Sequence, residues 1–283
     1  MKKKHDSELL SIIVPAYYCP TIQKDLQTII SYLDDLNRPW EIICVIDGKR
    51  NHKDKTYFKA KKVKHKSLRV YTYKQNMGKG YAIRFGMARA GGGVIAFIDA
   101  GGDLEARGLG MALEHMKWYN ADIIVGSKRH GASKVIYPWQ RKVLSFIVQR
   151  ATRFFFGLNI SDTQTGLKIF KRRVLVKILP RLLVKRWAFD LEMLAVANHL
   201  GFTRIYESPV EIVHNFMSNV GFSAVQNFII DYLAILYRIY ILHYYEDSYH
   251  DLWDGDPNLK LRYRWKNHEF QLLLLTTKKT IPI

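Results

Sequence analysis

The sequence is poor in cysteine and in acidic residues, and it lacks a long uncharged apolar run. Its two cysteines, Cys19 and Cys44, provide neither a disulfide framework nor the spacing of a zinc site, which is typical of a reducing compartment. No window holds about 18 uncharged apolar residues, so we expect no membrane-spanning helix. Asp and Glu number 25 against 44 Lys and Arg, which leaves a net charge of +19. This excess indicates an anionic partner: nucleic acid, a membrane surface or a phosphorylated substrate.

The first half of the chain alternates short apolar runs with amphipathic stretches. The runs that resemble strands cover residues 9–17, 40–48, 67–75, 93–100 and 121–129. Helix-like stretches lie between them, at residues 22–36, 79–90 and 108–119. Apolar, β-branched runs joined by helices predict an α/β fold with a mostly parallel, doubly wound sheet. Ligands of such sheets bind beyond the carboxyl ends of the strands.

Two carboxylates follow the fourth of these runs, Asp99 and Asp103. A strand that delivers an acid to its carboxyl end is a common way to build a metal or nucleotide site. The usual second acid would stand at position 101, which is glycine here. Because glycine permits turns that other residues resist, we expect Asp103 to reach back as the second ligand. The alternative is that Asp103 caps the helix that follows.

Residues 49–66 form a basic segment in which nine residues are Lys or Arg and only Asp54 is acidic. This segment is either a solvated basic surface or a surface that attracts anionic lipid or phosphate. We do not expect nucleic acid as a partner, because no recognised binding motif accompanies the charge.

Residues 222–245 form the most apolar stretch of the chain. Set on a helix, its polar residues form one narrow stripe, and Asp231 and Arg238 interrupt the run too often for a membrane span. We predict a helix that lies in a membrane interface or packs on the main domain. The predicted division is a main domain at residues 1–215 and an amphipathic helical region with its tail at residues 216–283.

Six motifs in order, between about residues 11 and 213, resemble family 2 glycosyltransferases with the Rossmann-like GT-A fold. More narrowly, the chain resembles polyprenyl-phosphate sugar synthases, such as the dolichyl-phosphate glucosyltransferases and mannosyltransferases. The most specific pair, "DTQTGLKIF" followed by "FDLE", favours the glucosyltransferases. The six motifs are "SIIVPAYY", "NMGKGYAIRFGM", "AFIDAGGDL", "DIIVGSKRH", "SDTQTGLKIFKRRVL" and "WAFDLEMLAVANHLGFTRIYESPVEI".

The resemblance implies an inverting transfer of a hexose from a nucleotide sugar, UDP-glucose or GDP-mannose, to a polyprenyl or dolichyl monophosphate. It implies Mg²⁺ or Mn²⁺ at the leaving diphosphate, and a peripheral position at the cytoplasmic face of a membrane. A membrane-protein partner is left open. One alternative is a transferase that acts on a sugar hydroxyl with Asp190 as its base. Another is a catalytically degenerate fold that serves as a membrane-associated binding module.

The resemblance also implies roles for single residues. Contacts to the donor fall to Pro15, Ala16, Tyr17, Asp47, Asn76, Lys79, Asp99 and Ala100. Contacts to the acceptor phosphate fall to Lys128, Arg141 and Ser145. The catalytic residues expected are Asp99 and Asp190, and the metal ligands expected are Asp99 and Asp103. The chain departs from the family pattern at Tyr18–Pro20, Ile46 and Gly101, where its relatives usually carry acids or an Asn-Glu-Glu run.

Overall fold

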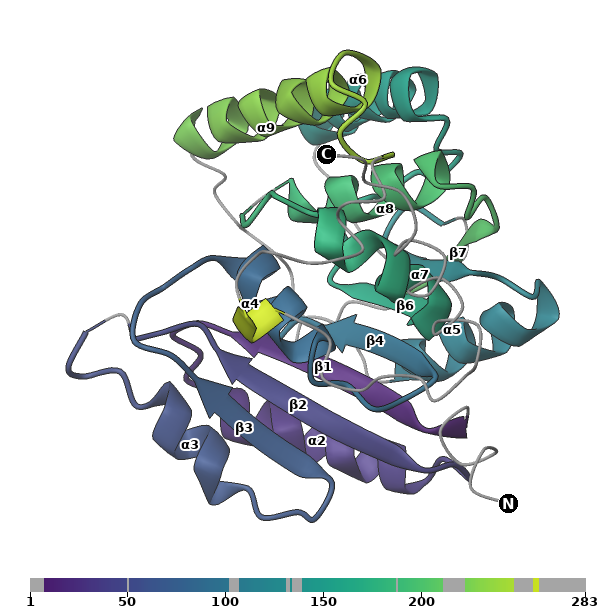
Figure 1. Cartoon of the computed structure of the whole chain (residues 1–283). Helices are drawn as coiled ribbons and strands as arrows, with labels where there is room; N and C mark the ends of the chain where they lie inside the picture. Colours follow the sequence, from purple (N-terminus) through teal and green to yellow (C-terminus); the bar gives the residue numbers. More distant parts are fainter. Residues whose placement is uncertain are drawn as a thin grey trace, which may run out of the picture.

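The apolar runs form a seven-stranded sheet, and helices cover both of its faces (Figure 1). The computed structural model describes residues 8–49, 51–101, 107–130, 133, 139–186, 188–210, 222–246 and 257–259. The strands are β1 (Leu10–Ala16), β2 (Trp40–Ile46), β3 (Leu68–Thr72), β4 (Val94–Ile98), β5 (Ile123–Ser127), β6 (Leu167–Lys171) and β7 (Ile205–Pro209). Their order in the sheet is β3-β2-β1-β4-β6-β5-β7.

The direction of the strands confirms the α/β fold with a mostly parallel sheet and corrects its detail. Strands β1 to β5 and β7 share one direction, whereas β6 runs antiparallel to both β4 and β5. The sequence predicted the first five strands but neither β6, which separates β4 from β5, nor β7, which lies at the edge beside β5. Six strands therefore end at one edge of the sheet, and β6 begins there.

Helices pack on the sheet through two cores. The helices are α2 (Ile22–Asp34), α3 (Thr56–Lys62), α4 (Lys79–Met87), α5 (Arg107–Trp118), α6 (Trp139–Phe156), α7 (Arg172–Ile178), α8 (Phe189–His199) and α9 (Phe222–Tyr240). Successive side chains of a strand point to opposite faces. Ile12 therefore lies in the core with α2 and α5, and its neighbour Ile13 lies in the core with α4, α7, α8 and α9.

Helix α9 packs on one side and is exposed on the other. Its Ile235 and Ile239 are buried in the core, and the hydroxyl of its Tyr240 donates to the carbonyl of Phe155 at the end of α6. Figure 1 shows α6 and α9 side by side at the end of the molecule farthest from α2 and α3.

None of the helices within the described ranges is both long and apolar enough to cross a membrane. The boundary expected between residues 215 and 216 falls in the range 211–221, outside the described residues. The division into two domains therefore stays a prediction.

Gly80 marks a close approach of α4 to α8, and it provides a test of the packing. A Cβ on Gly80 would lie 2.6 Å from Cγ of Phe189, whereas one on Gly108 would meet Leu167 and Val210 at 3.7 and 3.8 Å. Both glycines are the second residue of a helix. We expect Gly80→Ala to lower the free energy of unfolding by about 1–3 kcal/mol through overpacking. Gly108→Ala should leave it unchanged or raise it by up to about 1 kcal/mol, because alanine favours a helix. Urea unfolding measures both, and equal effects would contradict this account.

Candidate functional site

The carboxyl end of β4 places Asp99 at the edge of the sheet where the strands end. The backbone N–H of Asp99 donates to the carbonyl of Gly166 over 3.0 Å, directly before β6. A Cβ on Gly166 would overlap the carboxylate of Asp99, so this approach requires glycine. The antiparallel strand, which the sequence did not predict, thus helps to fix the position of Asp99.

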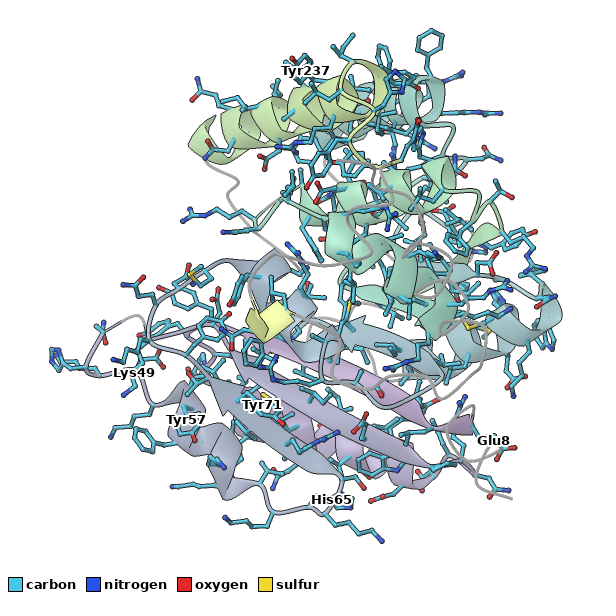
Figure 2. The ribbon with its side chains drawn as sticks, viewed as in Figure 1. Glu8, Lys49, Tyr57, His65, Tyr71 and Tyr237 are labelled. Carbon is cyan, nitrogen blue, oxygen red and sulfur yellow. The ribbon has the colours of Figure 1, made fainter. Side chains whose placement is uncertain are left out.

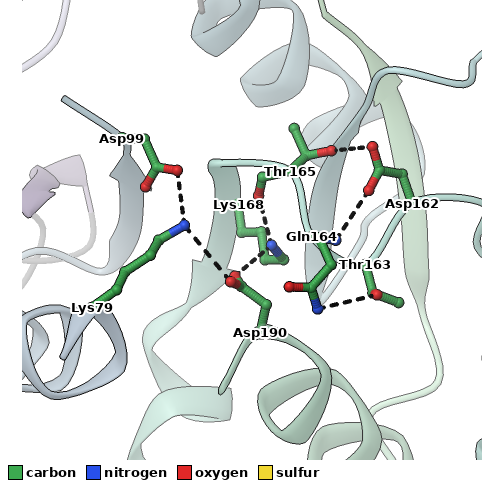
Figure 3. Close-up of polar contacts among 8 residues, drawn as sticks. All are labelled: Lys79, Asp99, Asp162, Thr163, Gln164, Thr165, Lys168 and Asp190. Carbon is green, nitrogen blue, oxygen red and sulfur yellow. Dashed lines mark hydrogen bonds and ion pairs between the residues drawn. The ribbon is translucent and has the colours of Figure 1, made fainter. Parts of the chain in front are cut away.

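A row of alternating charges leads from Asp99 into the protein (Figure 3). Lys79, the first residue of α4, donates from Nζ to Asp99 Oδ2 over 2.8 Å, and its Nζ lies 3.7 Å from Asp190 Oδ2. Lys168 of β6 donates to Asp190 Oδ1 over 2.6 Å and to the carbonyl of Thr165 over 2.7 Å. The Lys168 side chain is fully buried, and that of Asp190 is nearly so. Two ammonium groups and two carboxylates share this site, and their formal charges cancel.

The neighbouring charges set the ionisation of the row. Burial raises the pKa of Asp190, but Lys168 and Lys79 outweigh burial and hold that pKa below its usual value. Burial lowers the pKa of Lys79, but Asp190 and Asp99 outweigh it and raise that pKa. At Lys168 burial prevails over the attraction of Asp190, and the pKa is lowered. Asp190 is therefore held as a carboxylate, and a carboxylate with a lowered pKa is a poor proton acceptor at neutral pH.

Asp99 has one oxygen that suits a cation. Its Oδ2 accepts from Lys79, whereas its Oδ1 is inaccessible to water and accepts no hydrogen bond from any described residue. Such an orphaned carboxylate oxygen is a hard ligand of the kind that Mg²⁺ and Mn²⁺ prefer. No group of three or more His, Cys, Asp or Glu residues in the described part of the chain could hold a metal ion. A cation at Asp99 would therefore take its other ligands from phosphate, from water or from residues outside the described ranges.

The turn after Asp99 is held by α2, a contact that the sequence pattern did not predict. The N–H of Gly101, which has a φ of +116°, donates to Asp25 Oδ2 of α2 over 3.0 Å. Asp103 lies outside the described residues, so its role as metal ligand or helix cap stays a prediction.

The loop before β6 is built by carboxylates that bind backbone groups. Asp162 Oδ2 accepts from the hydroxyl of Thr165 over 2.6 Å, and its Oδ1 accepts from the N–H of Gln164 over 3.0 Å. Glu207 of β7 accepts from the N–H groups of Ser161 and Asp162 over 2.8 and 3.1 Å. The loop that leads to Lys168 is thus anchored at both ends.

Asp47, expected at the donor, binds the loop after β3. Its oxygens accept from the hydroxyl of Tyr73 (2.8 Å), from Nδ2 of Asn76 (2.9 Å), and from the N–H groups of Met77 (2.7 Å) and Gly78 (2.9 Å). The side chain is buried and holds the start of α4, from which Lys79 extends. Direct contacts of Asp47 and Asn76 with the donor stay predictions.

The other expected donor contacts lie along the same edge. Pro15 and Ala16 are buried at the end of β1, and Tyr17 follows them with an exposed side chain. Ala100 follows Asp99 and is partly buried. Their roles as donor contacts stay predictions.

The expected acceptor contacts come from two elements. The backbone N–H of Lys128 lies directly after β5 and donates to Asp162 Oδ2 over 3.4 Å. Arg141 and Ser145 belong to the first half of α6, and their side chains lie outside the described part of the structure. The roles of these three residues as contacts to the acceptor phosphate therefore stay predictions.

Lys168 is the site residue whose role the sequence did not indicate. A single lysine in the apolar stretch "LKIF" looks like the exposed position of an edge strand. The sequence feature that could have indicated its role is Asp190 of "FDLE", because a lysine buried in a central strand needs a carboxylate partner.

Comparison with known proteins identifies relatives of the chain. The family model described as "Glycosyl transferase family 2" matches residues 11–179, more than half of the chain. A dolichyl-phosphate beta-glucosyltransferase of Trichomonas vaginalis is 32% identical over 249 residues, which cover 82% of this chain and 75% of the relative. The enzyme of that name from Homo sapiens is 32% identical over 207 residues, 67% of this chain and 63% of the relative. The chain thus spans less than two thirds of the human relative.

Solved structures share the fold at low sequence identity. A glucosyl-3-phosphoglycerate synthase of Mycobacterium tuberculosis, crystallised with Mn²⁺, UDP and phosphoglyceric acid, has a TM-score of 0.60 at 17% identity. The likeness covers 81% of this chain and 78% of that one. A mannosyl-3-phosphoglycerate synthase of Rubrobacter xylanophilus has a TM-score of 0.63 at 14% identity, with 82% and 74% covered. These likenesses confirm the expected fold.

The Lys168–Asp190 pair can be tested by a double-mutant cycle. We expect Lys168→Met and Asp190→Asn each to lower the free energy of unfolding by about 3–5 kcal/mol, because each leaves a buried charge without its partner. The double variant should lose about 1–3 kcal/mol less than the sum of the single losses. Urea unfolding supplies all four values.

The exposed pair Lys117–Glu114, with atoms 2.7 Å apart, is the matched control. A cycle on this pair should give a coupling energy of about 0.5 kcal/mol or less. Additive losses at Lys168 and Asp190 would show that the buried pair is not coupled.

Proposed function

We propose that the chain, which belongs to glycosyl transferase family 2, transfers glucose from UDP-glucose to dolichyl or polyprenyl monophosphate. The chain is a glycosyltransferase. The proposal adds the sugar, the donor base and the acceptor. The relatives named dolichyl-phosphate beta-glucosyltransferases support the sugar and the acceptor.

One observation in the site favours a phosphate acceptor over a sugar hydroxyl. Attack by a hydroxyl acceptor is assisted most efficiently by a base whose pKa lies near the working pH. Asp190, the base expected for that reaction, is bound by Lys168 and Lys79, and its pKa is lowered. A phosphate monoester is already largely ionised near pH 7, so it needs no such base. Its oxygen attacks the anomeric carbon, the bond from that carbon to the diphosphate breaks with inversion, and the nucleoside diphosphate leaves.

In the proposed site, Asp99 lies beside the diphosphate of the donor. We assign its unpaired Oδ1 to a divalent cation, Mg²⁺ or Mn²⁺, which when bound neutralises charge on the leaving diphosphate. Lys79 lies beside Asp99 and adds a further positive charge next to the donor. The family's motif positions support Lys128, Arg141 and Ser145 as the groups that hold the acceptor phosphate.

We further propose that the α6–α9 surface lies on the membrane that carries the acceptor. This surface is the outer side of α6 and α9 with the residues after α9, and it exposes apolar side chains beside the exposed Arg150 and Arg153. The arginines suit anionic head groups. Figure 2 shows Tyr237 of this surface at the opposite end of the molecule from Tyr57 and His65 of the basic segment. The exposed apolar residues are Phe146, Phe154, Phe155, Ile229, Ile230, Leu233, Tyr237, Tyr240, Ile241 and Leu242.

The proposed location is the cytoplasmic face of that membrane, with the protein bound peripherally. Both Cys19 and Cys44 are buried and unpaired, which supports a reducing compartment. A membrane-protein partner stays a prediction.

Transfer of labelled glucose tests the proposed reaction. We expect UDP-glucose with dolichyl phosphate in liposomes to give lipid-extractable label that EDTA abolishes, and GDP-mannose to give none. Asp99→Asn should lower the rate by about 100-fold or more, as expected when a group that stabilises developing charge is lost. Asp35→Asn, an exposed acid at the end of α2, is the matched control and should keep the rate.

Each other outcome has a definite meaning. Label from GDP-mannose would overturn the sugar, and label on a saccharide hydroxyl would overturn the acceptor. No transfer from any donor, with the protein folded, would favour a binding module. Full activity of Asp99→Asn would overturn the assigned cation site.

Vesicle binding tests the α6–α9 surface. Ile230, with 63% of its surface exposed, and Leu233 lie on the outer side of α9. Burying one such side chain contributes about 1.5–3 kcal/mol, so Ile230→Glu with Leu233→Glu should weaken binding to anionic phospholipid vesicles by at least about tenfold. Trp118→Glu on α5, where the tryptophan is 67% exposed, is the control and should bind like the unchanged protein. Equal weakening by both, measured by vesicle flotation, would argue against this surface.

A further inference from the structure

Lys79 stands between two carboxylates but binds them unequally. Its Nζ lies 2.8 Å from Asp99 Oδ2 and 3.7 Å from Asp190 Oδ2 (Figure 3). Asp190 already has Lys168 at 2.6 Å, whereas Asp99 has no other cation among the described residues. Lys79 is thus chiefly the counter-ion of Asp99.

The backbone around Lys79 is fixed, and its side chain has room to move. The N–H of Gly78 donates to Asp47 Oδ2 over 2.9 Å, and the N–H of Gly80 donates to the carbonyl of Lys185 over 3.0 Å. The Lys79 side chain is about one-third exposed, at 35%, and so is that of Asp99, at 34%. A change of partner by Lys79 therefore needs only rotation of its side chain, from Asp99 toward Asp190 or toward a bound anion.

The charges of the row oppose a cation that arrives alone. The two ammonium groups and two carboxylates already cancel. A divalent cation at Asp99 Oδ1 would share the carboxylate with the ammonium of Lys79, and like charges a few ångströms apart repel strongly where water is partly excluded. A diphosphate removes this conflict, because it offers Lys79 another anionic partner.

We propose that Lys79 is a built-in counter-ion that occupies Asp99 until a diphosphate draws it away, so that the divalent cation and the diphosphate bind together. This proposal rests on the proposed function for its donor, a nucleoside diphosphate sugar with a cation. It assigns Lys79 a positioning role beyond contact with the donor: the lysine keeps the site neutral when empty and suppresses binding of the cation alone. Binding of each ligand then favours binding of the other by the same factor.

Replacement of Lys79 tests the proposal by binding alone. Lys79→Met should bind Mn²⁺ about tenfold more tightly than the unchanged protein in the absence of nucleotide, within the usual range of coupling between two ligands. The same variant should bind inorganic pyrophosphate in EDTA more weakly. Lys79→Gln should give the same two signs, and Lys79→Arg should resemble the unchanged protein. Electron paramagnetic resonance of free Mn²⁺ and calorimetry with pyrophosphate supply the two affinities.

Two controls separate the proposal from a general effect of charge. Lys117→Met removes an equally close lysine partner from an exposed carboxylate on α5 and should change neither affinity. Asp99→Asn added to Lys79→Met should abolish the gained Mn²⁺ affinity, since that carboxylate is the proposed ligand.

The opposite signs for cation and diphosphate distinguish a counter-ion from a merely structural lysine. Mn²⁺ binding that is no tighter in Lys79→Met and Lys79→Gln than in the unchanged protein would overturn the proposal. Loss of folding in both variants would overturn it as well, because the charge would then be a structural requirement. The assay contains neither sugar nor lipid acceptor, so failure of glucose transfer and failure of the counter-ion role are observed separately.

Discussion

A lysine buried out of contact with water requires a counter-charge, and the pair of Lys168 and Asp190 meets that requirement at the centre of the site. The pair joins β6 to α8, between which α7 lies in the sequence. Because Lys168 also binds the carbonyl of Thr165, the same ammonium holds the turn before β6. In the same turn, the carbonyl of Gly166 accepts the hydrogen bond from the N–H of Asp99. The position of the carboxylate at the end of β4 thus depends on an ion pair one strand away.

The periodicity of the sequence predicted the strands and helices whose side chains are buried at regular intervals. Strands β1 to β5 were expected because apolar β-branched residues run through them between helical stretches. The opposed directions of Asp190 and Glu192 follow from helix geometry, since residues two apart on a helix do not share a face. Asp190 contacts Lys168, whereas Glu192 accepts from the N–H groups of Leu183 and Val184.

Contacts between distant segments were not predictable from local pattern. Strand β6 was read only as part of a motif, because its pairing with β4 and β5 carries no local signal. The use of Asp47 to bind the start of α4 depends on the approach of the β2 and β3 ends. The connection of Asp25 to the turn at Gly101 is likewise a tertiary contact. Asp103 and the side chains of Arg141 and Ser145 lie outside the described residues, so their roles remain predictions from the motif positions.

Helix α8 connects the site with the outer helices. One turn of this helix carries Asp190, which faces the charged row, and Glu192, which faces the other way. Glu192 accepts from the hydroxyl of Tyr245 over 2.7 Å and lies 3.7 Å from Arg238 of α9. Burial raises the pKa of Glu192, against these hydrogen bonds. Glu192 therefore connects α8 with α9 and with the residues that follow α9.

The exposed apolar side of α9 has a consequence for kinetics. A protein held on a bilayer by that side meets a lipid by diffusion in two dimensions, whereas a nucleotide sugar reaches it from bulk solution. The two substrates would then follow different concentration scales: molecules per volume for the sugar donor and molecules per area for the lipid. Diluting the lipid acceptor within the membrane would slow such an enzyme even at a constant total amount of lipid phosphate, whereas diluting the vesicles would not, as long as the protein stays bound.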